Sequence, residues 1–353
     1  MRALVTGGTG FIGANVVRAL LRAGDEVRVL ARPESDLSNL RGLEVEVVHG
    51  DLRDATSLRA ATRACERVFH VGALYSFWVC DPDLIYEVNV EGTRHLLDAA
   101  GDAGARRIVV TSSVAALAVP RKGEAATEDT PLEPARIVGA YKRSKYLAEQ
   151  VALEAAERGL PVVIVNPSFP VGPWDAKPTP TGRVIVDFLN GRMPAYVETG
   201  MNVVAVEDVA QGHLLAAERG RLGERYILGG ENVTMRELLE ILSSVSGRPA
   251  PRIRVPYGPV LALSYANALA CRVTGTTPRM TPDTIRMSHH TMYYDPSKAR
   301  RELGLPSTPI EEALRSAVEW FTGHGYVRPQ RRRREPTRRR GRTREDPPRP
   351  VRS

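Results

Sequence analysis

The sequence has few cysteines, no histidine cluster and no long hydrophobic run, and each shortage excludes a class of protein. The three cysteines, Cys65, Cys80 and Cys271, are scattered, which suits a reducing compartment and excludes a disulfide framework. No CxxC, HExxH or other metal-ligand spacing occurs, so no metal site is predicted. The uncharged run at 258–271 is shorter than the roughly 20 residues that span a bilayer, and it predicts a core or interface helix. No signal peptide is expected, because a short strand at 2–6 leads straight into a glycine-rich loop.

The basic charge is concentrated at the carboxyl end of the sequence. Residues 328–353 hold 12 of the 49 basic and 3 of the 41 acidic residues, which leaves 37 basic and 38 acidic residues in 1–327. This near-neutral body gives no reason to expect a specific nucleic-acid partner. The Arg-rich tail at 328–353 is of low complexity and is predicted to be disordered. It is either a solvated extension or a weak contact to an anionic membrane, although nucleic acid would attract the same charge.

A glycine-rich loop lies between a buried-strand pattern at 3–6 and an amphipathic helix pattern at 14–23. Strand before and helix after are the context that a dinucleotide-binding fingerprint needs. The first glycine allows a tight turn, the second lets a pyrophosphate approach the backbone, and the third lets the helix pack close to the sheet. The free N–H groups of the helix would then face the phosphates. The predicted cofactor-binding residues of this loop are Gly7, Gly8, Thr9, Gly10, Phe11, Ile12 and Gly13.

The strands that follow supply the other end of the predicted cofactor site. The strand at 26–30 is followed by Arg32, at the position where an acid would hold the ribose of NAD. The guanidinium of an arginine can instead pair with the 2′-phosphate of NADP. NADP is therefore favoured, with NAD still open, because Glu34 or Asp36 could be the missing acid. Strands at 45–49 and 67–71 place further candidates beside the cofactor: Asp51, Leu52, Val71, Gly72 and Ala73.

Strand and helix patterns alternate from residue 3 to residue 166. This alternation predicts an α/β fold, a Rossmann-type doubly wound parallel sheet with right-handed crossovers. We expect the dinucleotide-binding domain at 1–166, with returns near 195–232 and 293–327. A smaller, mostly helical substrate lobe is expected at 167–194 and 233–292. The expected elements include one helix at 84–103, strands at 202–207 and 225–228, and helices at 183–190, 209–219, 235–246, 259–274 and 310–324.

A tyrosine and a lysine share one face of the helix pattern at 137–150. Tyr141 and Lys145 are spaced i, i+4, which places a phenol one helical turn from an ammonium. A cation at that distance is expected to lower the phenol's pKa towards neutrality, as proton transfer requires. Thr111 and Ser113 follow the strand at 107–110, at the sheet edge where ligands bind, and Ser113 could hydrogen-bond a substrate carbonyl. The alternative is a surface tyrosine and a solvated lysine.

Together these motifs resemble the extended short-chain dehydrogenase/reductases, over residues 1 to about 327. The residues that carry the resemblance are the loop at 7–13, Asp51-Leu52, Asn89, Thr111-Ser112-Ser113, the stretch 141–145 and Asn166-Pro167-Ser168. Within that group the chain looks most like the hopanoid-associated sugar epimerases, which are similar to dihydroflavonol reductases. That closer likeness lies in 31–33, 69–71, 177–183, 191–196 and 223–232.

The resemblance implies an enzyme and assigns roles to particular residues. Tyr141 would be the general acid/base, Lys145 would lower its pKa and hold the nicotinamide ribose, and Ser113 would orient the reacting oxygen. Pro167 and Ser168 would lie against the nicotinamide. Asn166 stands where the family usually has arginine, so the contacts of that arginine are in doubt. A homodimer is also implied. The protein is expected in the cytoplasm, with a peripheral membrane contact through the Arg-rich tail as the alternative.

Three functions fit this set of residues. A ketone reductase would use NADP and release it after one hydride transfer. A nucleotide-sugar 4-epimerase would retain NAD and return the hydride to the other face of the substrate. A non-catalytic NADP-binding sensor is the third, although such proteins tend to lack the tyrosine or the lysine. The substrate is expected to be a small carbonyl compound or a sugar.

Overall fold

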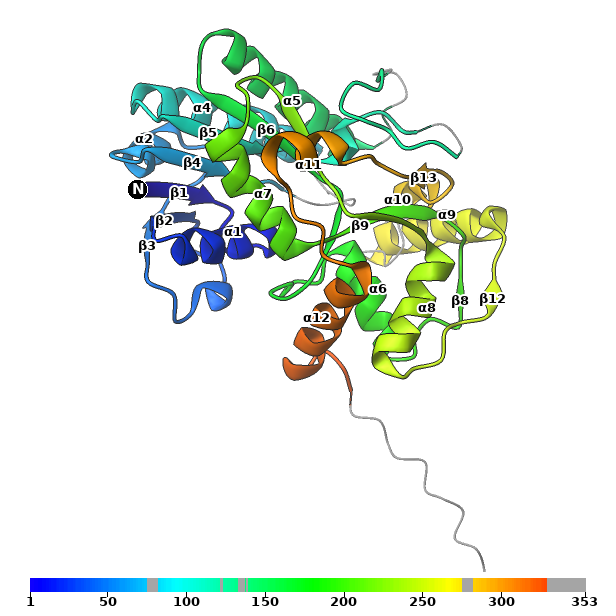
Figure 1. Cartoon of the computed structure of the whole chain (residues 1–353). Helices are drawn as coiled ribbons and strands as arrows, with labels where there is room; N and C mark the ends of the chain where they lie inside the picture. The colour runs from blue at the N-terminus through cyan, green and yellow to red at the C-terminus, as the bar shows by residue number, and fades with distance from the viewer. Residues whose placement is uncertain (75–81, 121–122, 133–136, 138, 275–281, 329–353) are drawn as a thin grey trace, which may run out of the picture.

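The centre of the molecule is a parallel sheet of seven strands. A computed structural model describes residues 1–353 except for 75–81, 121–122, 133–136, 138, 275–281 and 329–353 (Figure 1). The strand order is β10-β6-β5-β4-β1-β2-β3, and every pair in it is parallel. The order reverses next to β1, so this is the doubly wound Rossmann-type arrangement predicted above. The strands are β1 (Arg2–Thr6), β2 (Glu26–Ala31), β3 (Val45–His49), β4 (Arg67–His70), β5 (Arg107–Thr111), β6 (Val162–Pro167) and β10 (Arg225–Leu228).

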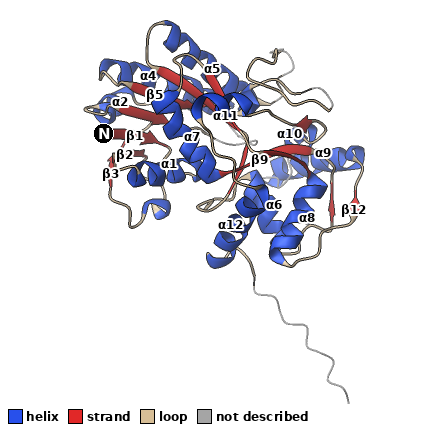
Figure 2. Ribbon diagram, in the orientation of Figure 1, coloured by secondary structure: helices blue, strands red, loops and turns tan. Residues whose placement is uncertain are grey.

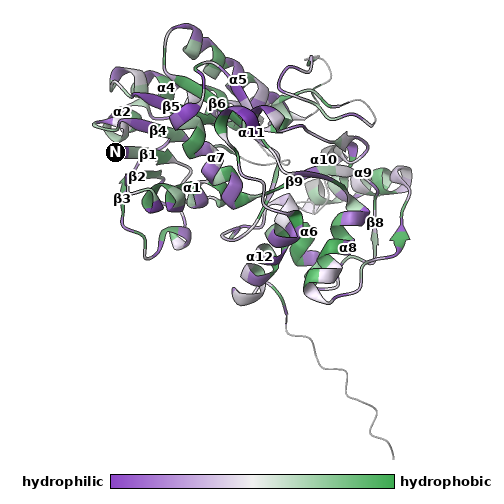
Figure 3. Ribbon diagram, viewed as in Figure 1, coloured by the Kyte–Doolittle hydropathy of each residue, from purple (hydrophilic) through white to green (hydrophobic). Residues whose placement is uncertain are grey.

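Helices cover both faces of this sheet because its strands are apolar on both sides (Figures 2 and 3). Alternate residues of β1 point to opposite faces: Ala3 and Val5 pack in one core, and Leu4 packs in the other. The first core includes residues of α1 (Phe11–Arg22), α7 (Val206–Arg219) and α11 (Ser297–Leu303). The second includes residues of α2 (Ala55–Thr62), α4 (Gly92–Asp102) and α5 (Ala140–Glu157).

A smaller lobe is built around the strand β9 (Gly200–Ala205). It pairs with β7 (Phe169–Val171), β11 (Glu231–Thr234) and β13 (Thr291–Met292). The helices α6 (Pro180–Leu189), α8 (Met235–Ser246) and α12 (Ile310–Gly323) share one hydrophobic core with this sheet. Two further helices, α9 (Tyr257–Thr274) and α10 (Pro282–Met287), contact each other, and β8 (Ala195–Tyr196) pairs with β12 (Ile253–Arg254).

The structure differs from the sequence-based expectations in several places. The single helix expected at 84–103 is instead α3 (Pro82–Tyr86), a π-helical turn η2 (Glu87–Glu91) and α4. The strands β7, β11 and β13 were not expected, because they are too short to show an alternating pattern. The domain boundaries stay a prediction. Within the expected return at 293–327, however, α11 packs on the large sheet whereas α12 packs in the smaller lobe.

Candidate active site

The glycine loop forms the tight turn that the sequence predicts. Gly7 has a φ of +68°, a conformation that favours glycine, and its carbonyl accepts a hydrogen bond from the amide of Gly10 at 2.9 Å. Gly13 packs against the Gly7 carbonyl, so a side chain there would separate α1 from the sheet. Gly8 is directed into the core, where Val29 fills the position of any Cβ, and does not line the site.

A cavity of about 670 Å³ lies at the carboxyl ends of the parallel strands. Its volume is within the range of small-molecule and cofactor sites. Of the predicted site residues, all except Gly8 line it. They are Gly7, Thr9, Gly10, Phe11, Ile12, Gly13, Arg32, Asp51, Leu52, Val71, Gly72, Ala73, Thr111, Ser113, Tyr141, Lys145, Pro167 and Ser168.

The Tyr141 hydroxyl is hydrogen-bonded with Ser113. Both residues line the cavity, although Tyr141 is only 9% exposed. Burial raises the pKa of Tyr141 above its usual value, and the hydrogen bond with Ser113 opposes this rise only in part. The prediction that Lys145 lowers the pKa of the phenol is therefore wrong. The Tyr141 side chain is buried and neutral, and it can donate a proton.

Lys145 is anchored to the strand beside it. Its Nζ donates to the carbonyl of Thr111 at 2.7 Å, and the side chain is nearly inaccessible to water. Burial lowers the pKa of Lys145 to about 8, although Glu149, one turn further along α5, raises it. The ammonium therefore persists at neutral pH and is lost as the pH rises through about 8.

Thr111 acts through its carbonyl, because its hydroxyl is engaged elsewhere. The Thr111 hydroxyl is hydrogen-bonded to His213 Nε2 at 2.8 Å, and His213 Nδ1 donates to the Val209 carbonyl at 2.8 Å. Burial lowers the pKa of His213 to about 4, so the ring is neutral. The sequence analysis missed His213, whose only signal was a polar residue on the buried face of a helix.

A second buried histidine fixes the loop that follows β4. His70 Nδ1 is hydrogen-bonded to the Thr6 hydroxyl at 2.8 Å and His70 Nε2 to the Thr93 hydroxyl at 2.9 Å. The Thr6 oxygen in turn accepts from the amide of Gly72 at 3.0 Å. Burial, helped by the charge of Lys145, lowers the pKa of His70 to about 3. This network holds Gly72 against the glycine turn without carrying a charge.

Asn89 lies in the π-helical turn and joins the loop that follows β4 to the helix α5, which carries Tyr141 and Lys145. Its Oδ1 accepts from the amide of Leu74 at 2.7 Å, and its Nδ2 donates to the Ser144 hydroxyl at 2.9 Å. Ser144 donates to the Tyr141 carbonyl at 2.8 Å. The π-helical turn thus directs the Asn89 side chain at two elements of the site. Such turns are frequent at functional sites.

Asn166 connects the backbone of Ser113 to a buried carboxylate. Its Nδ2 donates to the Ser113 carbonyl at 3.1 Å and to Glu149 Oε2 at 2.7 Å. Glu149 is almost fully buried, and its other oxygen lies 3.4 Å from Nη1 of Arg225 on β10. Asn166 and Arg225, on neighbouring strands, therefore contact the same buried carboxylate.

The nucleotide end of the cavity carries two arginines. Arg32 pairs with Glu34 at 3.2 Å, and Arg53 pairs with Asp51 at 2.9 Å, all of them on the cavity wall. Arg53 was not predicted, although it follows Asp51 by only two residues. Its guanidinium holds the pKa of the Asp51 carboxyl below its usual range.

The smaller lobe closes the other side of the cavity. Phe169 and Pro170 of β7 and Met292 of β13 line it, together with Ala176, Lys177, Thr179 and Thr181. Asp175 holds this last segment: its two carboxylate oxygens accept from the Thr179 amide, each at 3.0 Å. Burial raises the pKa of Asp175 to about 6.

The residues present fit a nicotinamide dinucleotide. Ser112 and Ser168 each hold a buried hydroxyl oxygen that has no hydrogen-bond partner in the described part of the chain, and both line the cavity. Such oxygens are available to a bound polar group. A Cβ at Gly10 would meet only the Gly7 carbonyl, at 3.3 Å, so the loop is open on its outer side. Within the described residues no cluster of side chains could hold a metal ion, and no helix could cross a membrane.

Comparison with known proteins places this site in a family. The model of the NAD dependent epimerase/dehydratase family matches residues 3–229. The chain belongs to that family. Its neighbours in structure include epimerases and dehydratases with the same extended short-chain dehydrogenase/reductase fold, and it is an enzyme that depends on NAD(P).

Several relatives span almost the whole chain. A dihydroflavonol 4-reductase-like protein from Synechocystis sp. is 49% identical over 92% of this chain and 96% of its own length. Sterol demethylase protein B from Methylococcus capsulatus is 41% identical over 93% of this chain and 100% of its own. The crystal structure of gox2253 is 45% identical, with a TM-score of 0.83 over 92% of this chain and 99% of that chain.

Proposed function

We propose that this family member is an NADP(H)-dependent oxidoreductase that interconverts a ketone and a secondary alcohol on a largely apolar small molecule. The observation that carries the proposal is the hydrogen bond between Ser113 and Tyr141, in the same cavity as the glycine turn. A hydroxyl pair so placed can bind the one oxygen that differs between a ketone and an alcohol.

Each residue of the site has a distinct part in this reaction. A bound nicotinamide supplies the hydride. Ser113 and Tyr141 hold the carbonyl oxygen, and Tyr141 gives that oxygen its proton as the alcohol forms. Because burial raises the pKa of Tyr141, the phenol is protonated before the reaction, which suits the reductive direction. The Thr111 carbonyl and Asn89 fix Lys145 and the helix that carries Tyr141.

The charge at the nucleotide end supports NADP over NAD. Arg32 and Arg53 lie on the cavity wall in the loops that follow the adjacent strands β2 and β3, and guanidinium groups bind phosphate oxygens in pairs. Both already contact acids, Glu34 and Asp51. A 2′-phosphate would therefore join an existing network of charges.

The substrate side of the cavity supports an apolar substrate. Val114, Phe169 and Met292 line it, and Tyr294 supports them by donating to the Val114 carbonyl at 3.2 Å. Two relatives are named for apolar substrates: sterol demethylase protein B, and a ketoreductase of a farnesyl quinoline oxide that is 32% identical. We extend this property, although not the named compounds, to this chain.

An epimerase is the second candidate. A nucleoside-diphosphate-sugar epimerase from Pseudomonas aeruginosa shares the fold with a TM-score of 0.75 at 29% identity, over 93% of this chain and 99% of that chain. The resemblance to hopanoid-associated sugar epimerases favours the same reaction. Such an enzyme would retain its nucleotide through each turnover. A homodimer and a cytoplasmic location also remain proposals.

One experiment separates the two reactions. Purified protein is denatured, and the released nucleotide is identified and counted. NADPH oxidation is then followed with a panel of apolar cyclic ketones and with nucleotide sugars. The proposal expects little retained nucleotide and ketone-dependent oxidation of NADPH. Stoichiometric NAD on denaturation, together with sugar interconversion and no net oxidation, would replace it with the epimerase.

A further inference from the structure

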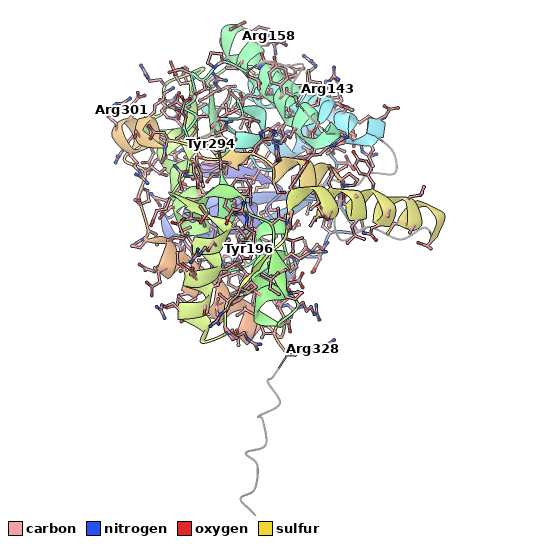
Figure 4. All side chains as sticks on the ribbon, turned by 90° about the vertical axis from the view of Figure 1, so that its right-hand side faces the viewer. Arg143, Arg158, Tyr196, Tyr294, Arg301 and Arg328 are labelled. Atoms are coloured by element: carbon pink, nitrogen blue, oxygen red, sulfur yellow. The ribbon has the colours of Figure 1, made fainter. Side chains whose placement is uncertain are left out.

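The outer face of α9 exposes apolar side chains. Leu263 is 60% exposed, Leu269 65% and Tyr265 44%, and no charged residue occurs from 258 to 271. The exposed positions recur with the period of a helix, so they form one stripe: Gly258, Pro259, Ala262, Leu263, Tyr265, Ala266, Leu269 and Ala270. Figure 4 shows α9 projecting from the body of the protein.

The inner face of the same helix is already used. Ser264 and Ala268 are buried, and α9 contacts α10, where Ile285 is also buried. From 258 to 271 the helix is thus uncharged on both sides, but only its inner side packs against the rest of the described chain. Exposed large apolar patches of this kind mark interaction surfaces rather than ordinary surface composition.

Positive charge flanks the exposed stripe in the sequence. Residues 248–286 contain six arginines and one acid, Asp283. Ile253 is 63% exposed between Arg252 and Arg254, which are exposed as well, and the Arg286 guanidinium lies 5.5 Å from the centre of the Tyr265 ring. An apolar face with a basic border is the pattern of helices that lie in the surface of a membrane.

We propose that the outer face of α9, together with Ile253 on β12, docks the enzyme on an anionic lipid bilayer. The helix lies in the plane of the membrane, with Leu263 and Leu269 in the acyl region and the bordering arginines at the lipid phosphates. A second copy of the chain is a poorer occupant, because a symmetric pair would bring two basic borders together. The surface does not include the Arg-rich tail, and it does not depend on the proposed reaction.

Vesicle flotation tests this docking surface. The full chain is mixed with vesicles of phosphatidylcholine alone or with 30 mol% phosphatidylglycerol (about a third anionic lipid). The double variant Leu263→Glu/Leu269→Glu is compared with Leu222→Glu, a matched control on a residue that is 55% exposed elsewhere. We expect wild type and control to float with anionic vesicles and the double variant to bind at least about tenfold less. Far-UV circular dichroism and NADPH binding report whether each variant is folded.

Three outcomes would overturn the proposal. The first is flotation of a folded double variant at the wild-type level, which would leave the tail as the membrane contact. The second is no flotation of the wild type at all. The third is a wild-type dimer in sedimentation that the double variant converts to monomer, without vesicle binding by either, which would make the stripe an interface between copies. Deleting residues 329–353 should weaken flotation without abolishing it.

Discussion

The large sheet and the smaller lobe differ in how regularly strands and helices alternate along the chain. In the large sheet, β1 pairs with β2 and β2 with β3, joined by single helices or loops. In the smaller lobe, Gly200 of β9 pairs with Thr291 and Val203 pairs with both Phe169 and Glu231. The alternation of strand and helix patterns along the sequence therefore predicts the large sheet, whereas the pairing in the smaller lobe is seen only in the folded chain.

The two walls of the cavity also come from different kinds of segment. The wall that fits the dinucleotide comes mostly from the carboxyl ends of β1 to β5, each with its own short motif. The wall that faces the substrate combines Val114, Phe169 and Met292, from three distant segments. Nucleotide binding should thus follow residues visible in the sequence, and substrate selection should follow residues that only the fold brings together. The predictions below test that separation.

The largest effect is expected from Tyr141→Phe. Removing the proton donor should lower kcat by about 10²- to 10⁴-fold, because general acid catalysis contributes that much. NADPH affinity, measured by fluorescence titration, should stay within about twofold, since the phenol contacts the reacting oxygen rather than the phosphates. Tyr146→Phe, on the same helix, is the control and should keep full activity.

A small loss of kcat in Tyr141→Phe would assign proton transfer to another group. An equal loss of NADPH affinity would instead show that the catalytic helix is part of the nucleotide site. Either result would break the division between the two walls.

The sequence predicted the site residues that belong to a local pattern, and it missed those whose role depends on contacts with other elements. Ser113, Tyr141 and Lys145 meet in one cavity because each follows or sits beside a strand with a readable pattern. The acidity of Tyr141 was predicted with the wrong sign, because i, i+4 spacing says nothing of how deeply that face is buried. His70 and His213 were missed for a similar reason: their partners are hydroxyls on other elements.

The second effect tests the substrate wall. Phe169 is partly buried on β7 and lines the cavity. Phe169→Ala should raise KM for an apolar substrate by about tenfold, because contact with a phenyl ring contributes on the order of 1.5 kcal/mol. The dissociation constant of NADPH should not change. A matching loss of NADPH affinity would mean that the two walls cannot be separated, and the melting temperature shows whether the variant is folded.

The third effect tests the nucleotide wall. Arg32→Ala should weaken NADPH binding by about fivefold, in keeping with an exposed charge-assisted contact, and should leave NADH unchanged. Arg41→Ala, an exposed arginine outside the cavity wall, is the control. Equal losses for both nucleotides would show that Arg32 does not reach a 2′-phosphate, and would favour NAD as the cofactor.

The smallest effect concerns Lys142, which lies beside Tyr141 but faces His290 of the smaller lobe. Lys142 is 7% exposed and makes no hydrogen bond or ion pair within the described residues. The pKa of His290 is lowered by burial, then by His289, and to a smaller extent by the charge of Lys142. Burial lowers the pKa of Lys142 to about 8. A buried ammonium without a partner destabilises the fold. Lys142→Met should therefore raise the free energy of unfolding at pH 7, by on the order of 1 kcal/mol.

The pH dependence of this gain supplies the sharper test. Between about pH 8 and the unfolded value of 10.5, the unfolded chain binds the proton that the folded chain has lost, so wild-type stability rises with pH. The advantage of Lys142→Met, measured by urea unfolding, should accordingly shrink from pH 7 to pH 10. Lys298→Met is the control, because Lys298 pairs with Glu224 at 2.7 Å and its loss should destabilise the protein. A Lys142→Met variant less stable than wild type at pH 7 would mean that the smaller lobe stabilises this ammonium, so that the two parts of the molecule are coupled at the catalytic helix.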